Sequence, residues 1–167
     1  MTLPDEITAE LDDLLGGDDV PMEVVDERVR ARFGPDAIVW EGDAATFQYT
    51  YVSASAEHAL GFARSRWVGE PTFWADVVVH AGDRDEAVSY CALATARKQH
   101  HVFDYRACTQ DGRVVWFRDY VKVILGPRQV PQRLRGFMVD VSALYRDLSA
   151  YTKHQAPSRA SLDALTA

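Results

Sequence analysis

The chain has 167 residues, of which 47% are apolar and 26% are charged, and its net charge at pH 7 is −7. This is the composition of a globular domain large enough to bury a core without disulfides, and it excludes a disordered chain. The acidic balance repels phosphate backbones and anionic lipid, so we expect neither nucleic acid nor a membrane surface as a direct partner.

The two cysteines and the first residues indicate a reducing compartment. Cys91 and Cys108 match no metal-ligand spacing, so we expect buried free thiols and no metal site. Residues 1–15 have neither a basic start nor an unbroken apolar run, and no window reaches the roughly 20 apolar residues that span a bilayer. We therefore expect a cytoplasmic protein.

Residues 1–35 predict a helical N-terminal extension. Ile7, Leu11 and Leu14 recur at helical spacing, and Gly16-Gly17 ends that pattern. A second helix is expected from about Asp19 to a stop at Gly34-Pro35. Its apolar stripe consists of Met22, Val25, Val29 and Phe33.

From residue 37 the apolar pattern becomes that of strands. Residues 37–40 and 46–52 are β-rich runs on either side of the turn signal Glu41-Gly42-Asp43, which predicts a hairpin. Residues 53–67 are broken into short pieces, and several short helical turns fit them better than one long helix.

A longer helix is predicted from about Arg84 to Lys98. Asp83 and Glu86 have the spacing of a capping box, and the basic end suits the negative pole of the helix dipole. The inward stripe is composed of small residues, which lets the helix approach a sheet closely or leaves room for something else. It comprises Ala87, Val88, Cys91 and Ala94 or Thr95.

Three consecutive antiparallel strands fill the last third of the chain. Residues 101–109 and 114–125 flank an Asp111-Gly112 hairpin turn, and 133–141 follow after a loop. We expect Asp104, Arg106, Arg118 and Asp119 to form a surface ladder across these strands. Leu144, Leu148 and Tyr151 then continue at helical spacing, so a short exit helix and a frayed tail from residue 153 are expected.

Five short motifs lie along this order of elements. They are Phe73-Trp74, His80-Ala81-Gly82-Asp83-Arg84, Tyr105-Arg106, Asp111-Gly112 with Trp116, and Gly136-Phe137-Met138-Val139-Asp140-Val141-Ser142. In their joint spacing, from about residue 37 to 142, the chain resembles a PAS domain. It departs from that family at Ala81 and Gly82, where Pro and Asp are usual.

The resemblance implies an α+β fold with a five-stranded antiparallel sheet that carries short helices and one longer helix on one face. N-terminal helices at 1–35, a sensory domain at 36–142, and an exit helix and tail at 143–167 are the expected parts. In such domains the sheet cups a ligand against the longer helix, and the exit helix passes the change to a partner.

The resemblance also implies partners. With no kinase, cyclase or DNA-binding segment after Ser142, we expect output to a separate signalling protein, such as a kinase or transcription regulator, and we expect a homodimer. An N-terminal helix in PAS proteins packs on the outer sheet face or on a second subunit. The candidate contacts are Met22, Val25, Val29, Phe33, Leu144 and Leu148.

Candidates for lining a ligand pocket are mostly aromatic, since such sites are apolar with a few polar tips. They are Phe73, Trp74, Tyr90, Cys91, Phe103, Tyr105, Trp116 and Phe137. Strand alternation puts Phe103 and Tyr105 on one face, but the sequence leaves open which face holds a ligand.

The cofactor is left open by the sequence. No cysteine lies between Ser53 and Asp83, where light-sensing PAS domains carry the one that forms a flavin adduct, so that chemistry is excluded while non-covalent flavin is not. Haem would need a histidine, with His80 or His100 as candidates. A hydrogen bond that stabilises its own loop is the preferred role of His80, and a favourable place at a helix C-terminus is that of His100 and His101.

Two other functions remain as alternatives. A cup-shaped α+β enzyme of the cyclase or isomerase type would use an interior His80 or Asp119 for proton transfer. A purely structural role without a ligand is the third. We assign no catalytic residue and prefer the sensory or docking function.

Overall fold

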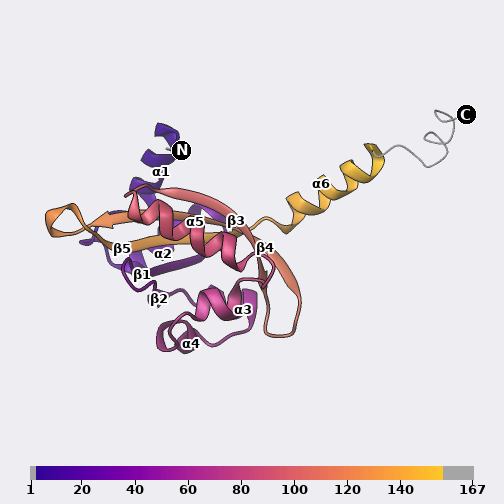
Figure 1. Ribbon diagram of the computed structural model, residues 1–167, viewed down its shortest axis with the longest axis horizontal. Helices are drawn as coiled ribbons and strands as arrows, with labels where there is room; N and C mark the ends of the chain where they lie inside the picture. The colour runs from indigo at the N-terminus through magenta and orange to yellow at the C-terminus, as the bar shows by residue number, and fades with distance from the viewer. Residues whose placement is uncertain (1–2, 156–167) are drawn as a thin grey trace, which may run out of the picture.

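The computed structural model describes residues 3–155, and its centre is a five-stranded antiparallel sheet with the strand order β2-β1-β5-β4-β3 (Figure 1). The strands are β1 (Ile38–Asp43), β2 (Tyr49–Val52), β3 (His101–Cys108), β4 (Val114–Leu125) and β5 (Pro131–Asp140). Every neighbouring pair is antiparallel, so the predicted fold class is confirmed. A 3-10 turn, η2 (Pro127–Gln129), joins β4 to β5.

The first hairpin turns later than the sequence predicts, because Glu41-Gly42-Asp43, the expected turn, is the end of strand β1. Strand β2 begins at Tyr49 rather than at Thr46. The carboxylate of Asp43 accepts hydrogen bonds from the backbone N–H groups of Ala45 and Thr46, both at 2.8 Å. These local bonds hold the segment in a turn, as Asp does when its side chain replaces a backbone acceptor.

One face of the sheet, here called the inner face, is covered by the helices that follow the first hairpin. These are α3 (Ser55–Leu60), α4 (Arg64–Gly69), the π-helical turn η1 (Trp74–Val78) and α5 (Arg84–Ala96). Their apolar side chains share one buried core with Ile38, Phe117 and Leu134 of the sheet. The short helical turns and the longer helix are thus where the sequence placed them.

The predicted capping box at the start of α5 is wrong. Asp83 makes no side-chain cap; its carboxylate instead accepts bonds from the Arg106 guanidinium, at 2.6 and 3.0 Å, and from the Arg106 backbone N–H at 2.8 Å. Three bonds from one residue, two of them from a cationic guanidinium, outweigh a single cap bond to a backbone N–H. The bonds from Arg106 also lower the pKa of Asp83.

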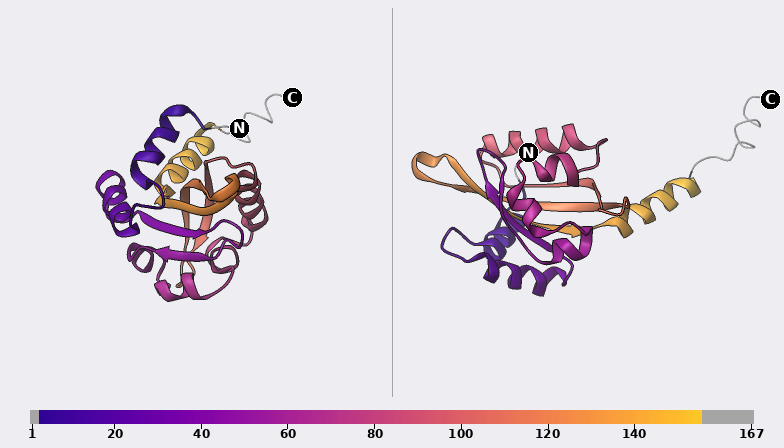
Figure 2. Two further views of the ribbon diagram at one scale, coloured as in Figure 1. Left: turned by 90° about the vertical axis from the view of Figure 1, so that its left-hand side faces the viewer. Right: turned by 90° about the horizontal axis from the view of Figure 1, so that it is seen from below.

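The opposite, outer face is covered by α1 (Asp5–Leu15) and α2 (Met22–Phe33), as the two views in Figure 2 show. Met22, Val25 and Val29 are buried in a second core with Val39 and other outer-face residues. Of the two roles that the resemblance left open for this stripe, packing on the chain's own sheet is the one observed. The expectation that these three side chains contact a second subunit is therefore wrong, because the chain's own sheet already covers them.

Helix α6 (Ser142–Gln155) projects away from the body of the domain (Figure 1) and continues past residue 153, where the sequence predicts a frayed tail; residues 156–167 of that tail lie outside the described residues. Its root is fixed by the backbone N–H of Trp116, which donates to Ser142 Oγ at 2.9 Å. Beyond the root, Leu144 is 43% exposed and Leu148 is 51% exposed. Within residues 3–155 no helix is long and apolar enough to cross a membrane.

Candidate functional site

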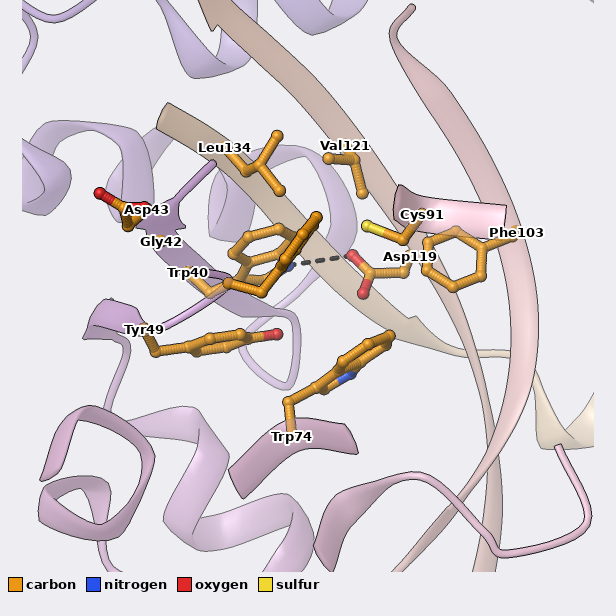
Figure 3. Close-up of a pocket in the computed structure, with 11 residues that line it drawn as sticks. Trp40, Gly42, Asp43, Tyr49, Trp74, Cys91, Phe103, Asp119, Val121 and Leu134 are labelled. Atoms are coloured by element: carbon orange, nitrogen blue, oxygen red, sulfur yellow. Dashed lines mark hydrogen bonds between the residues drawn. The ribbon is translucent and has the colours of Figure 1, made fainter. Parts of the chain in front are cut away.

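A small cavity lies between the inner face of the sheet and α5, and Figure 3 shows the side chains around it. Its volume is about 20 Å³, which is space for about one water molecule. Aromatic rings from four elements surround it: Trp40 of β1, Tyr49 of β2, Trp74 of η1 and Phe103 of β3. The cavity is where α5, with its small residues, faces the sheet.

Asp119 is the one carboxylate buried in this cavity wall among the described residues. Its side chain, in a residue 1% exposed, accepts a hydrogen bond from Trp40 Nε1 at 2.9 Å and from Tyr105 Oη at 3.0 Å. Trp74 Nε1 donates in turn to Tyr105 Oη at 3.0 Å. Burial raises the pKa of Asp119 to about 7, because the two hydrogen bonds offset only part of the loss of solvation.

The expected surface ladder is therefore only half right. Asp104 and Arg118 do pair across β3 and β4, but Asp119 points the other way, into the interior. The signal was present in the sequence, since Asp119 alternates with Phe117 and Val121, which are both buried on the inner face.

Tyr49 is a second cavity residue that sequence reasoning missed. Its ring stacks on Trp40 with centroids 5.0 Å apart, and Figure 3 shows its hydroxyl end directed into the cavity. Burial raises the pKa of this phenol well above its ordinary value, so it stays protonated. Trp40 was missed as well, because a short β run gives no indication of which residue faces a pocket.

Cys91 and His101 form a neutral pair beside the cavity. His101 Nδ1 lies 3.0 Å from the carbonyl oxygen of Gln99 and must donate to it, so Nε2 is the acceptor that faces the Cys91 thiol at 3.4 Å. Burial raises the pKa of Cys91 to about 12 and lowers that of His101. The thiol is therefore a packing residue at neutral pH, not a nucleophile.

Four of the predicted pocket residues are brought together. Trp74, Cys91 and Phe103 line the cavity, and Tyr105 supports it through its bond to Asp119. The cavity thus lies on the inner face, a choice that the sequence left open.

The other four predicted pocket residues lie elsewhere. Phe73 packs edge-on against Trp67 in the core, and Tyr90 is 45% exposed in a surface groove beside β3. Trp116 lies at the root of α6. Phe137 is on the outer face, stacked on Tyr120 with centroids 4.6 Å apart, because its neighbours Gly136 and Met138 take the inner positions.

The residues around the cavity do not fit haem or flavin. A volume of about 20 Å³ is far below the roughly 300 Å³ or more of a cofactor pocket. His80 accepts a hydrogen bond from the backbone N–H of Gly82 at 3.0 Å, as preferred from the sequence. His100 accepts one from Val123 N–H at 3.0 Å, and neither ring lines the cavity.

Other ionic sites and proton-transfer pairs gain no support from the described residues. Among residues 3–151 there is no cluster of three His, Cys, Asp or Glu side chains that could hold a metal. Burial lowers the pKa of both His100 and His101, contrary to the expectation of cations at a helix end. His80 lies outside the cavity that Asp119 lines, so the pair imagined for an enzyme is not assembled there.

Gly136 gives a direct test of how tightly the cavity wall is packed. A Cβ at this position of β5 would lie 2.6 Å from the Trp40 ring and 2.5 Å from the Tyr120 carbonyl oxygen. We expect Gly136→Ala to lower the free energy of unfolding by about 1–3 kcal/mol and to displace the Trp40 indole from Asp119. Urea denaturation and the tryptophan emission maximum measure the two effects. Gly69→Ala, which meets nothing within 4 Å, is the control; equal stability of both variants would contradict the packing described here.

Comparison with known proteins agrees with this architecture. Residues 49–138 match the sequence family described as PAS fold. No curated protein matches the chain. The chain is 32% identical to the N-terminal domain of a diguanylate cyclase with PAS/PAC sensor from Marinobacter aquaeolei; the alignment covers 65% of this chain and 98% of that one, with a TM-score of 0.59.

More distant solved structures share the fold alone. A sensory box histidine kinase/response regulator from Burkholderia thailandensis E264 is 17% identical, over 77% of this chain and 93% of that one, with a TM-score of 0.62. A PAS domain from Colwellia psychrerythraea is 16% identical, over 72% and 98%, with a TM-score of 0.57. The matched residues, the strand order and the placement of α5 lead to one conclusion: this chain belongs to the PAS fold family.

Proposed function

We propose that this PAS domain is a sensory module whose interior cavity responds to a small ligand and whose exit helix α6 passes the change to a separate signalling protein. The receiving protein is an effector such as a kinase or a transcription regulator, or a second copy of this chain in a homodimer. The site of action is the cytoplasm, where two free thiols stay reduced.

The observation that carries this proposal is that the cavity and the root of α6 lie on opposite faces of the same two strands. On the inner face Phe103 of β3 stands opposite Asp119 of β4, and both line the cavity. One residue along, Asp104 stands opposite Arg118 on the outer side. Because side chains alternate along a strand, a shift of β3 against β4 at the cavity also moves the outer pair.

The outer pair belongs to a set of contacts, here called the latch, that holds α6. Arg118 forks onto Asp104 at 2.8 and 3.0 Å, and Tyr145 of α6 donates its hydroxyl to the same carboxylate at 2.7 Å. The Tyr145 ring stacks on Trp116 with centroids 3.8 Å apart and planes at 3°. These four residues connect α6 to the two strands that carry the cavity.

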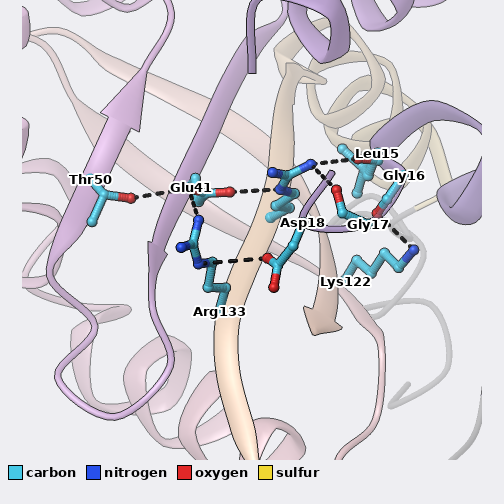
Figure 4. A network of polar contacts seen from close by, with 9 residues as sticks. Leu15, Gly16, Gly17, Asp18, Glu41, Thr50, Lys122 and Arg133 are labelled. Carbon is cyan, nitrogen blue, oxygen red and sulfur yellow. Dashed lines mark hydrogen bonds and ion pairs between the residues drawn. The ribbon is translucent and has the colours of Figure 1, made fainter. Parts of the chain in front are cut away.

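The N-terminal helices, in contrast, are held by a buried ionic clamp on the outer face (Figure 4). Arg135 of β5 pairs with Glu41 of β1 at 2.6 Å and donates to the carbonyl oxygens of Leu15 and Gly17 at 3.1 and 2.7 Å. Lys122 of β4 donates to the carbonyl of Gly16 at 2.9 Å. Cations at the C-terminal end of α1 match its dipole. A buried clamp favours a fixed α1, which leaves α6 as the moving element.

Helix α6 also offers the surface that a partner needs. Leu144 and Leu148 are about half exposed and recur one turn apart on a helix of 14 residues. An isolated helix of this length is marginal in water, so contact with a partner stabilises it. The two leucines remain the proposed contacts for the effector or second copy.

Hydrogen exchange of the α6 backbone tests the proposed coupling. Asp119→Asn changes the cavity without touching α6, and we expect amides of residues 143–149 to exchange at least several-fold faster or slower than in the wild type, with α2 unchanged as an internal reference. Glu86→Gln, which also replaces a carboxyl by an amide but at an exposed position of α5 outside the cavity, is the matched control. Identical α6 exchange in all three proteins would overturn the proposal.

The latch itself gives a smaller prediction. Tyr145→Phe keeps the stack on Trp116 and removes the hydroxyl that donates to Asp104. The free energy of unfolding of the whole domain should fall by no more than about 1 kcal/mol, while α6 exchange rises. Urea denaturation and hydrogen exchange separate the two, and a loss of global stability without faster α6 exchange would argue against the latch.

A further inference from the structure

The chemistry of the cavity wall selects a type of ligand. None of the 11 residues that line it is Lys, Arg or His, and its charged side chains are both acidic, Asp43 and Asp119. The Asp43 carboxylate is at the surface and is used by its own turn. Asp119 is therefore the buried charge, and its two hydrogen-bond donors, the Trp40 indole and the Tyr105 phenol, are neutral.

Aromatic faces complete the environment of this carboxylate. Trp40, Tyr49, Trp74 and Phe103 surround the cavity, so their rings meet at the point toward which Asp119 is directed (Figure 3). Aromatic faces carry negative electrostatic potential and attract cations, most strongly when water is excluded. A carboxylate among such rings repels an anion, and it favours a cation over a neutral molecule because an ionised buried acid is stabilised by an opposite charge.

A groove beside α5 adjoins the cavity. The groove, of about 140 Å³, is lined by Thr72, Ala75 and Val88 among others, and it shares Phe47, Trp74 and Cys91 with the cavity. These three shared residues are the wall between groove and cavity. Displacing the Phe47 or Trp74 side chain joins the two spaces into one site large enough for a molecule of several heavy atoms.

The backbone on both sides of this wall is unusual. Phe47 has φ 59° and Thr72 has φ 60°, a left-handed conformation that bulky and β-branched residues rarely adopt. Trp74 begins the π-helical turn η1. Strained backbone and π-helical turns are enriched at binding and switch sites. Unusual backbone thus lies at the wall that a ligand coming from the groove has to pass.

We propose that the cavity around Asp119 takes a small organic ammonium ion, which enters through the groove past Phe47 and Trp74 and places its charge between the Asp119 carboxylate and the aromatic rings. The inference rests on the proposed function, since it names the ligand class of the same sensory site. The inference specifies the charge of the ligand, its approximate size, and Asp119 as the residue that contacts the charged group.

Three probes that share a tert-butyl group test the charge of the ligand. Tert-butylammonium, tert-butanol and pivalate share one apolar group and carry a positive, a neutral and a negative head. By isothermal titration calorimetry at pH 8, we expect the ammonium ion to bind at least tenfold more tightly than the alcohol, and pivalate not to bind. Equal affinity for the alcohol, tighter binding of pivalate, or no binding of the ammonium ion would each overturn the inference.

Variants locate the binding at the cavity. Asp119→Asn should weaken ammonium binding at least tenfold and leave the alcohol unchanged, while Glu86→Gln should bind both as the wild type does. Phe47→Ala keeps the carboxylate and opens the wall, so it should bind the ammonium ion more tightly or faster. Undiminished ammonium binding in Asp119→Asn, or slower and weaker binding in Phe47→Ala, would contradict the assigned site.

The failure of this inference is separable from failure of the proposed function. If the alcohol binds as well as the ammonium ion and α6 exchange still responds to Asp119→Asn, the cavity is a sensory site for neutral ligands and only the ligand class is wrong. If the ammonium ion binds with the expected preference but α6 exchange responds to neither ligand nor variant, the site stands and the output through α6 fails.

Discussion

Replacing Glu41 by Leu should lower the free energy of unfolding by about 3–5 kcal/mol, because it leaves a buried charge without its partner. The change leaves Arg135, whose side chain is 2% exposed, without the carboxylate that lies 2.6 Å away. Arg133, the second partner of Glu41 at 3.2 Å, is 45% exposed and keeps Asp18 as a partner at 3.6 Å. Urea denaturation with an unchanged m-value measures the loss.

Two further proteins make this prediction specific. The double variant Glu41→Leu/Arg135→Met should recover part of the loss, because apolar side chains of similar volume tolerate a site that one unpaired charge does not. Recovery is incomplete, since Arg135 also holds the end of α1. Glu70→Leu removes the partner of Arg66 in an exposed pair, which water screens, and should change the free energy of unfolding far less. A loss in Glu41→Leu as small as that in Glu70→Leu would contradict the buried clamp.

The second large effect is a dependence of stability on pH that Asp119 introduces. Its pKa is about 7 in the folded protein against 3.8 for an ordinary aspartate, so between these values the folded state holds a proton that the unfolded state has lost. The stability that this group contributes is complete below about pH 4 and is lost as pH rises through 7, at up to about 1.4 kcal/mol per pH unit.

Asp119→Asn removes the titrating proton and should flatten this part of the profile. The other titratable groups around Asp119 are Tyr49 of β2, Tyr105 of β3 and Cys91 of α5, and burial raises the pKa of each far above the window. The difference in unfolding free energy between wild type and variant, measured by urea denaturation from pH 4.5 to 8, isolates the group. A difference that does not change with pH would show that Asp119 keeps an ordinary pKa.

The sheet could be read from the sequence because its signals are local. Alternating apolar residues and the Asp111-Gly112 turn define β3 and β4, and those strands lie within a residue or so of the prediction. The five PAS-like motifs added the order of elements. Which face of the sheet a side chain occupies was harder to predict. Phe137 was expected in the pocket, but a difference of one position along the strand places it on the outer face.

Only the apolar residues of the candidate site could be predicted from the sequence. Trp74, Phe103 and Tyr105 were found because aromatic residues near α5 belong in a pocket, whereas Asp119 was set on the surface because charged residues usually lie there. Because Phe117 and Val121, two positions away on either side, are buried, strand alternation places Asp119 in the interior instead. The contact between Asp83 and Arg106, 23 positions apart, is tertiary, and no local pattern distinguishes it from a capping box.

The stripe of α2 shows the same limit. An apolar helix face predicts burial but does not say whether the chain's own sheet or another subunit covers it. Val25 and Val29 are covered by the outer face, and this depends on Val39 and Phe137 presenting an apolar surface there. Leu144 and Leu148, on a helix that projects from the domain, remain the contacts proposed for a partner.

The four tryptophans allow the central claim to be measured in one experiment. Trp40 and Trp74 surround the cavity and Trp116 is in the latch, so fluorine NMR of fluorotryptophan-labelled protein observes both sites. As pH is raised past the Asp119 midpoint of about 7, all three resonances should shift with one midpoint, and all three shifts should vanish in Asp119→Asn. A Trp116 resonance that stays fixed while those of Trp40 and Trp74 move would show that the cavity and α6 are not coupled.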